Sequence, residues 1–154
     1  MKKIFFILLL LTILSRTNAT ELHIADLIVN FPCLVTLPDT ISPTTALYKC
    51  SSDNVDFELH IIKDSNLKTF EDFIKDFTKK NKATILTNEN KTWDHKTIKY
   101  LEASFSKEGE ELISESYLYS GEEGMFFMTA IRHKDNPRKT ETQIFLNSLI
   151  IIHP

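Results

Sequence analysis

Apolar and polar residues alternate with a period of two over much of the chain, the pattern of strands that have one buried face. In the clearest segment, Phe57, Leu59 and Ile61 alternate with Glu58 and His60. Other segments share this strand-like pattern or a short apolar run bounded by turn residues. The predicted strands cover residues 27–31, 46–50, 57–61, 83–87, 95–106, 112–120 and 125–133.

Three details of this pattern refine the prediction. Residues 125–133 are apolar at both parities over most of their length, which predicts a central strand with helices over one side. In residues 95–106 the apolar positions change parity, which predicts a bulge or bend near Tyr100 and Leu101. The polar residues 88–91 predict a turn between two strands.

One segment has the period of a helix. Its apolar residues fall at i, i+3, i+4 and i+7 and form a single stripe: Phe70, Phe73, Ile74 and Phe77. Thr69 and Asp72 resemble a capping box, with Asp in place of the usual Glu or Gln, so the helix begins after Thr69. Asn81 can end it. We interpret the aromatic stripe as the face that packs on a sheet rather than as a ligand-binding wall.

A second helix is predicted to start at residues 135–137, where Pro lies near the first turn. Ile144, Phe145 and Leu149 give this helix an apolar side, and residues 149–152 follow as an extended, buried tail. The order of elements predicts an α+β fold. We expect a twisted, mostly antiparallel sheet with two helices packed against it, both on one face.

Several short motifs together resemble the PsbP-like fold over residues 24–152. The early strand ends in Phe31-Pro32, the second strand contains Tyr48, and the closing helix reads Phe145-Leu-Asn-Ser-Leu149. The capped helix and the long hairpin complete the likeness. Photosystem lumenal proteins, a eukaryotic Ran-GTPase-binding regulator and small exported bacterial proteins share this fold. The resemblance implies an α-β-α or two-layer antiparallel architecture and a largely non-enzymatic repertoire, but it assigns no binding residue.

The first 19 residues have the layout of a secretory signal peptide. Lys2 and Lys3 precede an apolar run that is too short to span a bilayer as a helix, and Thr17 and Ala19 supply the small residues of a cleavage site. An uncleaved anchor is the alternative, because Arg16 lies close to that site. We expect export to the periplasm or the medium, which argues against a cytosolic GTPase-binding role. A single domain would then span residues 20–154.

Removal of the leader changes the charge of the chain. The 18 basic residues fall to 15 against 21 acidic ones, so the mature net charge is −6. This acidic balance disfavours nucleic acid and anionic membranes as partners. Cys33 and Cys50 both lie in the exported part, and an even pair in an oxidising compartment predicts a disulfide. Two buried free thiols or a redox pair are the alternatives, and no Cys-x-x-Cys motif supports the latter.

The sequence contains none of the motifs that carry common chemistries. The histidines at positions 23, 60, 95, 133 and 153 form no i, i+4 pair, and neither His-Glu-x-x-His nor Gly-x-Ser-x-Gly occurs. All three glycines fall in predicted turns, so none remains for a phosphate loop. We therefore expect no enzyme activity, no metal and no cofactor.

Two further features have a functional and a structural interpretation. A basic cluster surrounds the predicted start of the second helix, where it could contact a small anion or an acidic partner or could simply be a solvated loop: Arg132, His133, Lys134, Arg138 and Lys139. Trp93, the one tryptophan, could be an exposed partner contact, but we favour a place at the edge of the core.

These expectations combine into two hypotheses. In the first, the chain is an exported, non-enzymatic domain that binds a protein partner or assists an envelope process. In the second, it is a small-ligand carrier or enzyme with a pocket between sheet and helices, which its 11 Phe and 4 Tyr residues could line. The sequence leaves the oligomeric state open.

Overall fold

The structure, a computed structural model, describes residues 19–36, 39–42, 44–63, 69–93, 95–121 and 124–152. Apart from Ala19, the predicted signal peptide lies outside these described residues. The strands are β1 (Thr20–Ile24), β2 (Leu27–Phe31), β3 (Asp39–Ser42), β4 (Thr45–Ser52), β5 (Val55–Ile62), β6 (Thr84–Trp93), β7 (Lys96–Lys107), β8 (Glu110–Gly121), β9 (Gly124–His133) and β10 (Ile150–Ile151). The helices are α2 (Phe70–Asn81) and α3 (Lys139–Leu146).

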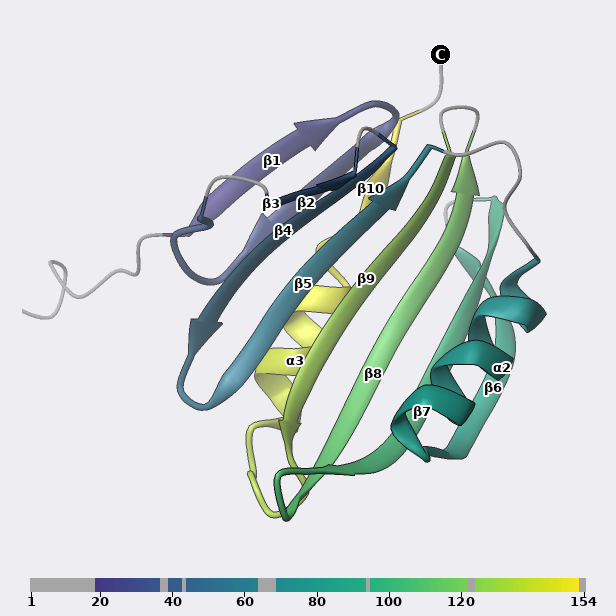
Figure 1. Cartoon of the computed structure of the whole chain (residues 1–154). Helices are drawn as coiled ribbons and strands as arrows, with labels where there is room; N and C mark the ends of the chain where they lie inside the picture. Colours follow the sequence, from purple (N-terminus) through teal and green to yellow (C-terminus); the bar gives the residue numbers. More distant parts are fainter. Residues whose placement is uncertain are drawn as a thin grey trace, which may run out of the picture.

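The described strands form two antiparallel sheets (Figure 1). The larger sheet has seven strands in the order β3-β4-β5-β9-β8-β7-β6, and the smaller has three in the order β1-β2-β10. β9 lies in the middle of the larger sheet, as its apolar pattern predicts. The expected fold class, a mostly antiparallel sheet with two helices packed against it, is confirmed. β1 was not among the predicted strands.

The two helices cover opposite faces of the larger sheet, so the prediction that they share one face is wrong. Phe145 of α3 packs into a core with Phe57 of β5, whereas Ile74 of α2 packs against Leu118 and Phe127. Figure 1 shows α2 in front of the sheet and α3 behind it. The central strands carry apolar residues at both parities, and each face therefore needs its own cover.

The apolar positions of β7 change parity because its residues also pack under different helices on the two faces of the sheet. Tyr100 belongs to the core under α3, whereas the next residue, Leu101, belongs to the core under α2. β7 stays in register with β8 from Lys99 to Lys107, so a bulge in β7 near these two residues is ruled out, whereas the alternative of a bend stays a prediction. The irregularity lies in the neighbouring strand β6, where the register shifts between Ile85 and Thr87.

β6 also passes straight through the turn predicted at residues 88–91. It continues to Trp93, and β7 begins at Lys96, which pairs with Trp93. Because β6 is at the edge of the sheet, most of its polar side chains reach solvent, and a run of polar residues does not interrupt it.

The core under α3 is centred on one aromatic ring. The ring of Phe145 lies 5.0 Å from that of Phe31 and 5.0 Å from that of Phe57, so it joins the helix to both sheets. The helix begins at Lys139, later than residues 135–137. Ile144 is 64% exposed rather than part of the apolar side.

α2 begins as predicted. Thr69 Oγ1 accepts a hydrogen bond from the backbone N–H of Asp72 at 3.3 Å, and the Asp72 carboxylate accepts one from the N–H of Thr69 at 3.1 Å. On the face that α2 covers, Lys99 Nζ of β7 donates to the Glu71 carboxylate at 2.5 Å. This contact lowers the pKa of Glu71 and ties the first turn of α2 to β7.

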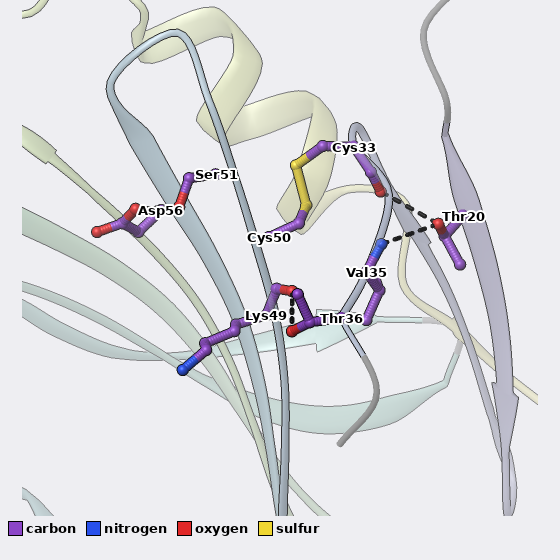
Figure 2. The surroundings of a disulfide bond; sticks show 8 residues. All are labelled: Thr20, Cys33, Val35, Thr36, Lys49, Cys50, Ser51 and Asp56. Carbon is purple, nitrogen blue, oxygen red and sulfur yellow. Dashed lines mark hydrogen bonds between the residues drawn. A yellow bond between two sulfur atoms is a disulfide. The ribbon is translucent and has the colours of Figure 1, made fainter. Parts of the chain in front are cut away.

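Cys33 and Cys50 form a disulfide, with their Cα atoms 5.9 Å apart (Figure 2). The bond joins the segment after β2 to β4, and so links the smaller sheet to the larger one. Thr20 Oγ1 donates to the carbonyl of Cys33 at 3.2 Å and accepts from the N–H of Val35 at 3.1 Å, which holds the same segment to β1. The bridge and these hydrogen bonds fix the position of the smaller sheet.

Truncation of the central ring tests this packing. Phe145→Ala removes a side chain that is 1% exposed, and we expect the free energy of unfolding to fall by about 3–5 kcal/mol. The neighbouring variant Ile144→Ala is the control, because its side chain faces solvent; its effect should stay within about 0.5 kcal/mol. Urea denaturation measures both values. Equal losses in the two variants would contradict the placement of α3.

Candidate functional site

A groove of about 450 Å³ opens between α2 and the larger sheet. In Figure 1, α2 lies over β6 and β7. Its side chains reach Leu118 of β8 and Phe127 of β9, but much of β5, β9 and β8 lies beyond the helix on the same face. We call this hollow the α2-face groove. Side chains of α2 form its wall, and side chains of β5, β9 and β8, with Leu101 of β7, form its floor.

A row of polar residues crosses the otherwise apolar floor, because three neighbouring strands place them in register. Glu58 of β5 lies opposite Thr129 of β9, which lies opposite Ser116 of β8. The Oγ atoms of Ser116 and Thr129 are 2.9 Å apart and share a hydrogen bond. Residues directly opposite one another in a sheet point to the same face. This row therefore lies across the sheet beside α2, and Ser114 and His60 extend the floor.

The wall of the groove is aromatic. Phe73 and Phe77 of α2 stack with their ring centroids 6.5 Å apart. Phe73 also lies 4.1 Å from Phe127 of the sheet, which is almost fully buried. The stripe that the sequence assigns to packing therefore has two roles: it anchors α2 and it lines the open edge of the groove. Asp76 and Lys80, on the next turns, complete the wall with charges of both signs.

His60 is the one histidine of the groove. Its Nε2 lies 3.1 Å from the Glu58 carboxylate, and both side chains are about one-third exposed or less. Among the described hydrogen bonds, His60 contacts this carboxylate and no hydroxyl group. The groove thus offers hydroxyl, imidazole and carboxylate groups to a ligand, without an assembled nucleophile and base.

No group of three or more His, Cys, Asp or Glu side chains in the described part of the chain could hold a metal ion. No helix within the described ranges is long and apolar enough to cross a membrane.

A second polar cluster lies on the opposite face, buried between the sheet and α3. The Glu115 carboxylate is fully buried and accepts hydrogen bonds from Tyr100 at 3.2 Å, from Arg132 at 3.4 Å and from Gln143 of α3. Burial, and then the negative charge of Glu115, raises the pKa of Tyr100. Glu115 borders none of the described pockets. We therefore interpret the cluster as the polar attachment of α3 to the sheet.

The basic cluster expected around the start of α3 is not assembled as one surface. Arg132 points into the Glu115 cluster and is 7% exposed, so it is not available to an outside anion. Arg138 lies 2.9 Å from the Asp53 carboxylate and 3.1 Å from that of Glu141. His133 lies 3.4 Å from the Glu110 carboxylate. Nearby carboxylates thus already contact these basic side chains, which disfavours an anion site.

The remaining two basic residues, Lys134 and Lys139, are exposed. A shallow pocket of about 380 Å³ lies beside them, and its lining mixes Arg138 and His133 with Asp53 and Asp135. Mixed charges of this kind favour no single class of ligand.

Trp93 lies at the edge of the core under α3, in agreement with the favoured interpretation. Its Nε1 donates to the carbonyl of Leu149 at 2.9 Å, and its ring lies 5.6 Å from that of Tyr117. The indole thus joins the end of β6 to the segment before β10.

The α2-face groove was not located by sequence reasoning, although a pocket between sheet and helices was one of the two hypotheses. The sequence does contain a signal for this groove. Small polar residues occupy positions that face one side of otherwise apolar strands: Ser114, Ser116 and Thr129. Polar residues in the middle of a central sheet indicate a face without a full apolar cover.

Comparison with solved structures shows that the chain has a PsbP-like fold. Cyanobacterial PsbP (CyanoP) of Synechocystis sp. PCC 6803 superposes with a TM-score of 0.62 and 11% identity, over 86% of this chain and 92% of the other. PA94 of Pseudomonas aeruginosa, a protein of unknown function, gives a TM-score of 0.55 and 10% identity, over 88% and 98% of the two chains. At these identities the likeness establishes the fold alone.

The other comparisons add little. LpqN of Mycobacterium tuberculosis, which is involved in cell envelope biogenesis, superposes with a TM-score of only 0.40 and 10% identity, over 88% of this chain and 83% of the other. No protein-family model matches the chain, and no curated protein is similar to it in sequence.

The raised pKa of Tyr100 predicts a loss of stability in alkali. The unfolded chain releases the phenol proton near pH 10, whereas the folded protein retains it, so the free energy of unfolding falls as the pH rises above about 10. Tyr100→Phe should make this fall shallower, although Tyr117, whose pKa is also raised by burial, keeps part of it. Urea denaturation at a series of pH values measures how steeply the free energy of unfolding falls in each protein. The series runs from about pH 8 to about pH 11, and so spans the ordinary tyrosine pKa of about 10. Parallel slopes would contradict this interpretation of the Glu115 cluster.

Proposed function

We propose that this chain is an exported, non-enzymatic accessory domain that binds another protein through the α2-face groove. The observation that carries the proposal is the groove itself, which combines an aromatic wall with a row of polar side chains on its floor at an open part of the surface. An apolar side chain of a partner would contact Phe73 and Phe77, while its backbone would exchange hydrogen bonds with Thr129 and His60.

Export is supported by the leader and by the disulfide. Cys33 and Cys50 are paired, and such bonds persist in oxidising compartments and are rare in the cytosol. The acidic mature charge fits a protein partner better than nucleic acid. The fold shared with CyanoP and PA94 is consistent with an accessory role.

The size of the groove supports a second candidate function, the carriage of a small ligand. Its volume of about 450 Å³ falls within the roughly 300–1,000 Å³ of small-molecule sites, and such sites also combine apolar walls with a few polar groups. The two functions share one surface and therefore predict the same sensitivity to substitutions there.

A blocking substitution tests the site and separates the two functions. Thr129→Arg places a long charged side chain in the floor, and Thr140→Arg makes the same change at an exposed position of α3 on the other face. We expect the wild-type protein and Thr140→Arg to capture the same partner from the envelope fraction of the source cells. Thr129→Arg should bind this partner at least about tenfold more weakly, so that the captured amount falls by about 90%.

Circular dichroism must show both variants folded. Native mass spectrometry of the purified proteins gives the alternative outcome: a small molecule held by the wild type and by Thr140→Arg, but absent from Thr129→Arg, supports the carrier function. Full partner capture by folded Thr129→Arg would overturn the assignment of the groove.

A further inference from the structure

β6 is a long strand at the outer edge of the larger sheet. It pairs with β7 along its length, and no other described strand pairs with its outer side. Such an edge presents a row of backbone N–H and C=O groups to any strand that approaches it. The outer side of β6 lies away from the α2-face groove, none of whose lining residues belongs to this strand.

The straight part of β6 is symmetric about one residue. The register shift ends at Thr87 and the strand ends at Trp93, so Asn90 is the midpoint of the uninterrupted segment. In an antiparallel pair of two identical strands related by a two-fold axis at Asn90, Thr87 of each copy lies opposite Trp93 of the other. The complete straight segment is then paired.

The charges of this segment are complementary in the same register. Glu89 and Lys91 flank Asn90, so Glu89 of each copy lies opposite Lys91 of the other. Both side chains reach solvent, with 52% and 36% of their surfaces exposed, and they lie on the same face of the sheet, 3.4 Å apart within one chain. Opposite charges in directly facing positions stabilise a strand pair.

The remaining pairs contain no conflict. Asn88 lies opposite Thr92, and Asn90 faces its own copy, so each pair joins groups that can exchange hydrogen bonds. A two-fold axis at Glu89 or at Lys91 would instead place identical charges opposite one another. The charge pattern therefore selects the register in which the straight segments match in full.

We propose that β6 is a self-association edge, through which two copies of this chain join their seven-stranded sheets by antiparallel β6–β6 pairing centred on Asn90. An interface of one strand pair is small, so the dimer forms at high micromolar protein concentration and weakens as salt screens the two ion pairs.

Charge reversal tests the register directly. Glu89→Lys gives a chain with two positive charges, and Lys91→Glu gives a chain with two negative charges, so each variant alone places like charges opposite one another. We expect each reversal to weaken dimerisation by about tenfold or more in sedimentation equilibrium. An equimolar mixture of the two variants should form a heterodimer, and the double variant Glu89→Lys with Lys91→Glu should dimerise as the wild type does.

Glu111→Lys and Lys139→Glu reverse exposed charges away from β6 and are the controls. Circular dichroism verifies that every variant is folded. The proposal is overturned if the wild type is monomeric at all concentrations. It is also overturned if either single reversal dimerises as the wild type does, or if the mixture of folded single variants stays monomeric.

Discussion

The central strands of the larger sheet are apolar on both faces, and this constraint determines the rest of the architecture. Phe126 of β9 belongs to the core under α3, and its neighbour Phe127 belongs to the core under α2. Each face must be covered to keep such residues from water, at roughly 25 cal/mol for each Å² of apolar surface. The two helices therefore lie on opposite faces, and the smaller sheet with its disulfide completes the cover on the side of α3.

The two covers differ in extent, and the difference creates the site. On one face, α3 and the smaller sheet enclose the core and even bury the Glu115 carboxylate with its partners. On the other face, α2 alone covers β6 and β7 and leaves β5, β9 and β8 partly open (Figure 1). The open floor carries Thr129 and His60, whose polar groups tolerate water, beside the aromatic residues that hold the helix.

Local signals in the sequence predicted the elements whose causes are local. The period of two in β5 and the capping box at Thr69 each determine their own element, and both are confirmed. The side of the sheet that each helix covers depends on contacts between distant residues, such as that of Phe145 with Phe31, and no local pattern encodes it. Arg132 shows the same limit. It belongs to a basic run in the sequence, but in the fold it is buried and paired with the Glu115 carboxylate on the neighbouring strand.

The central claim is that the open half of the α2 face is the working surface. Site-specific photo-crosslinking in the source cells tests it, with a photoreactive amino acid at Lys80, on the wall of the groove, or at Ile144, exposed on α3. The account predicts a discrete adduct from position 80 and none from position 144. An adduct from position 144 in the absence of one from position 80 would contradict it.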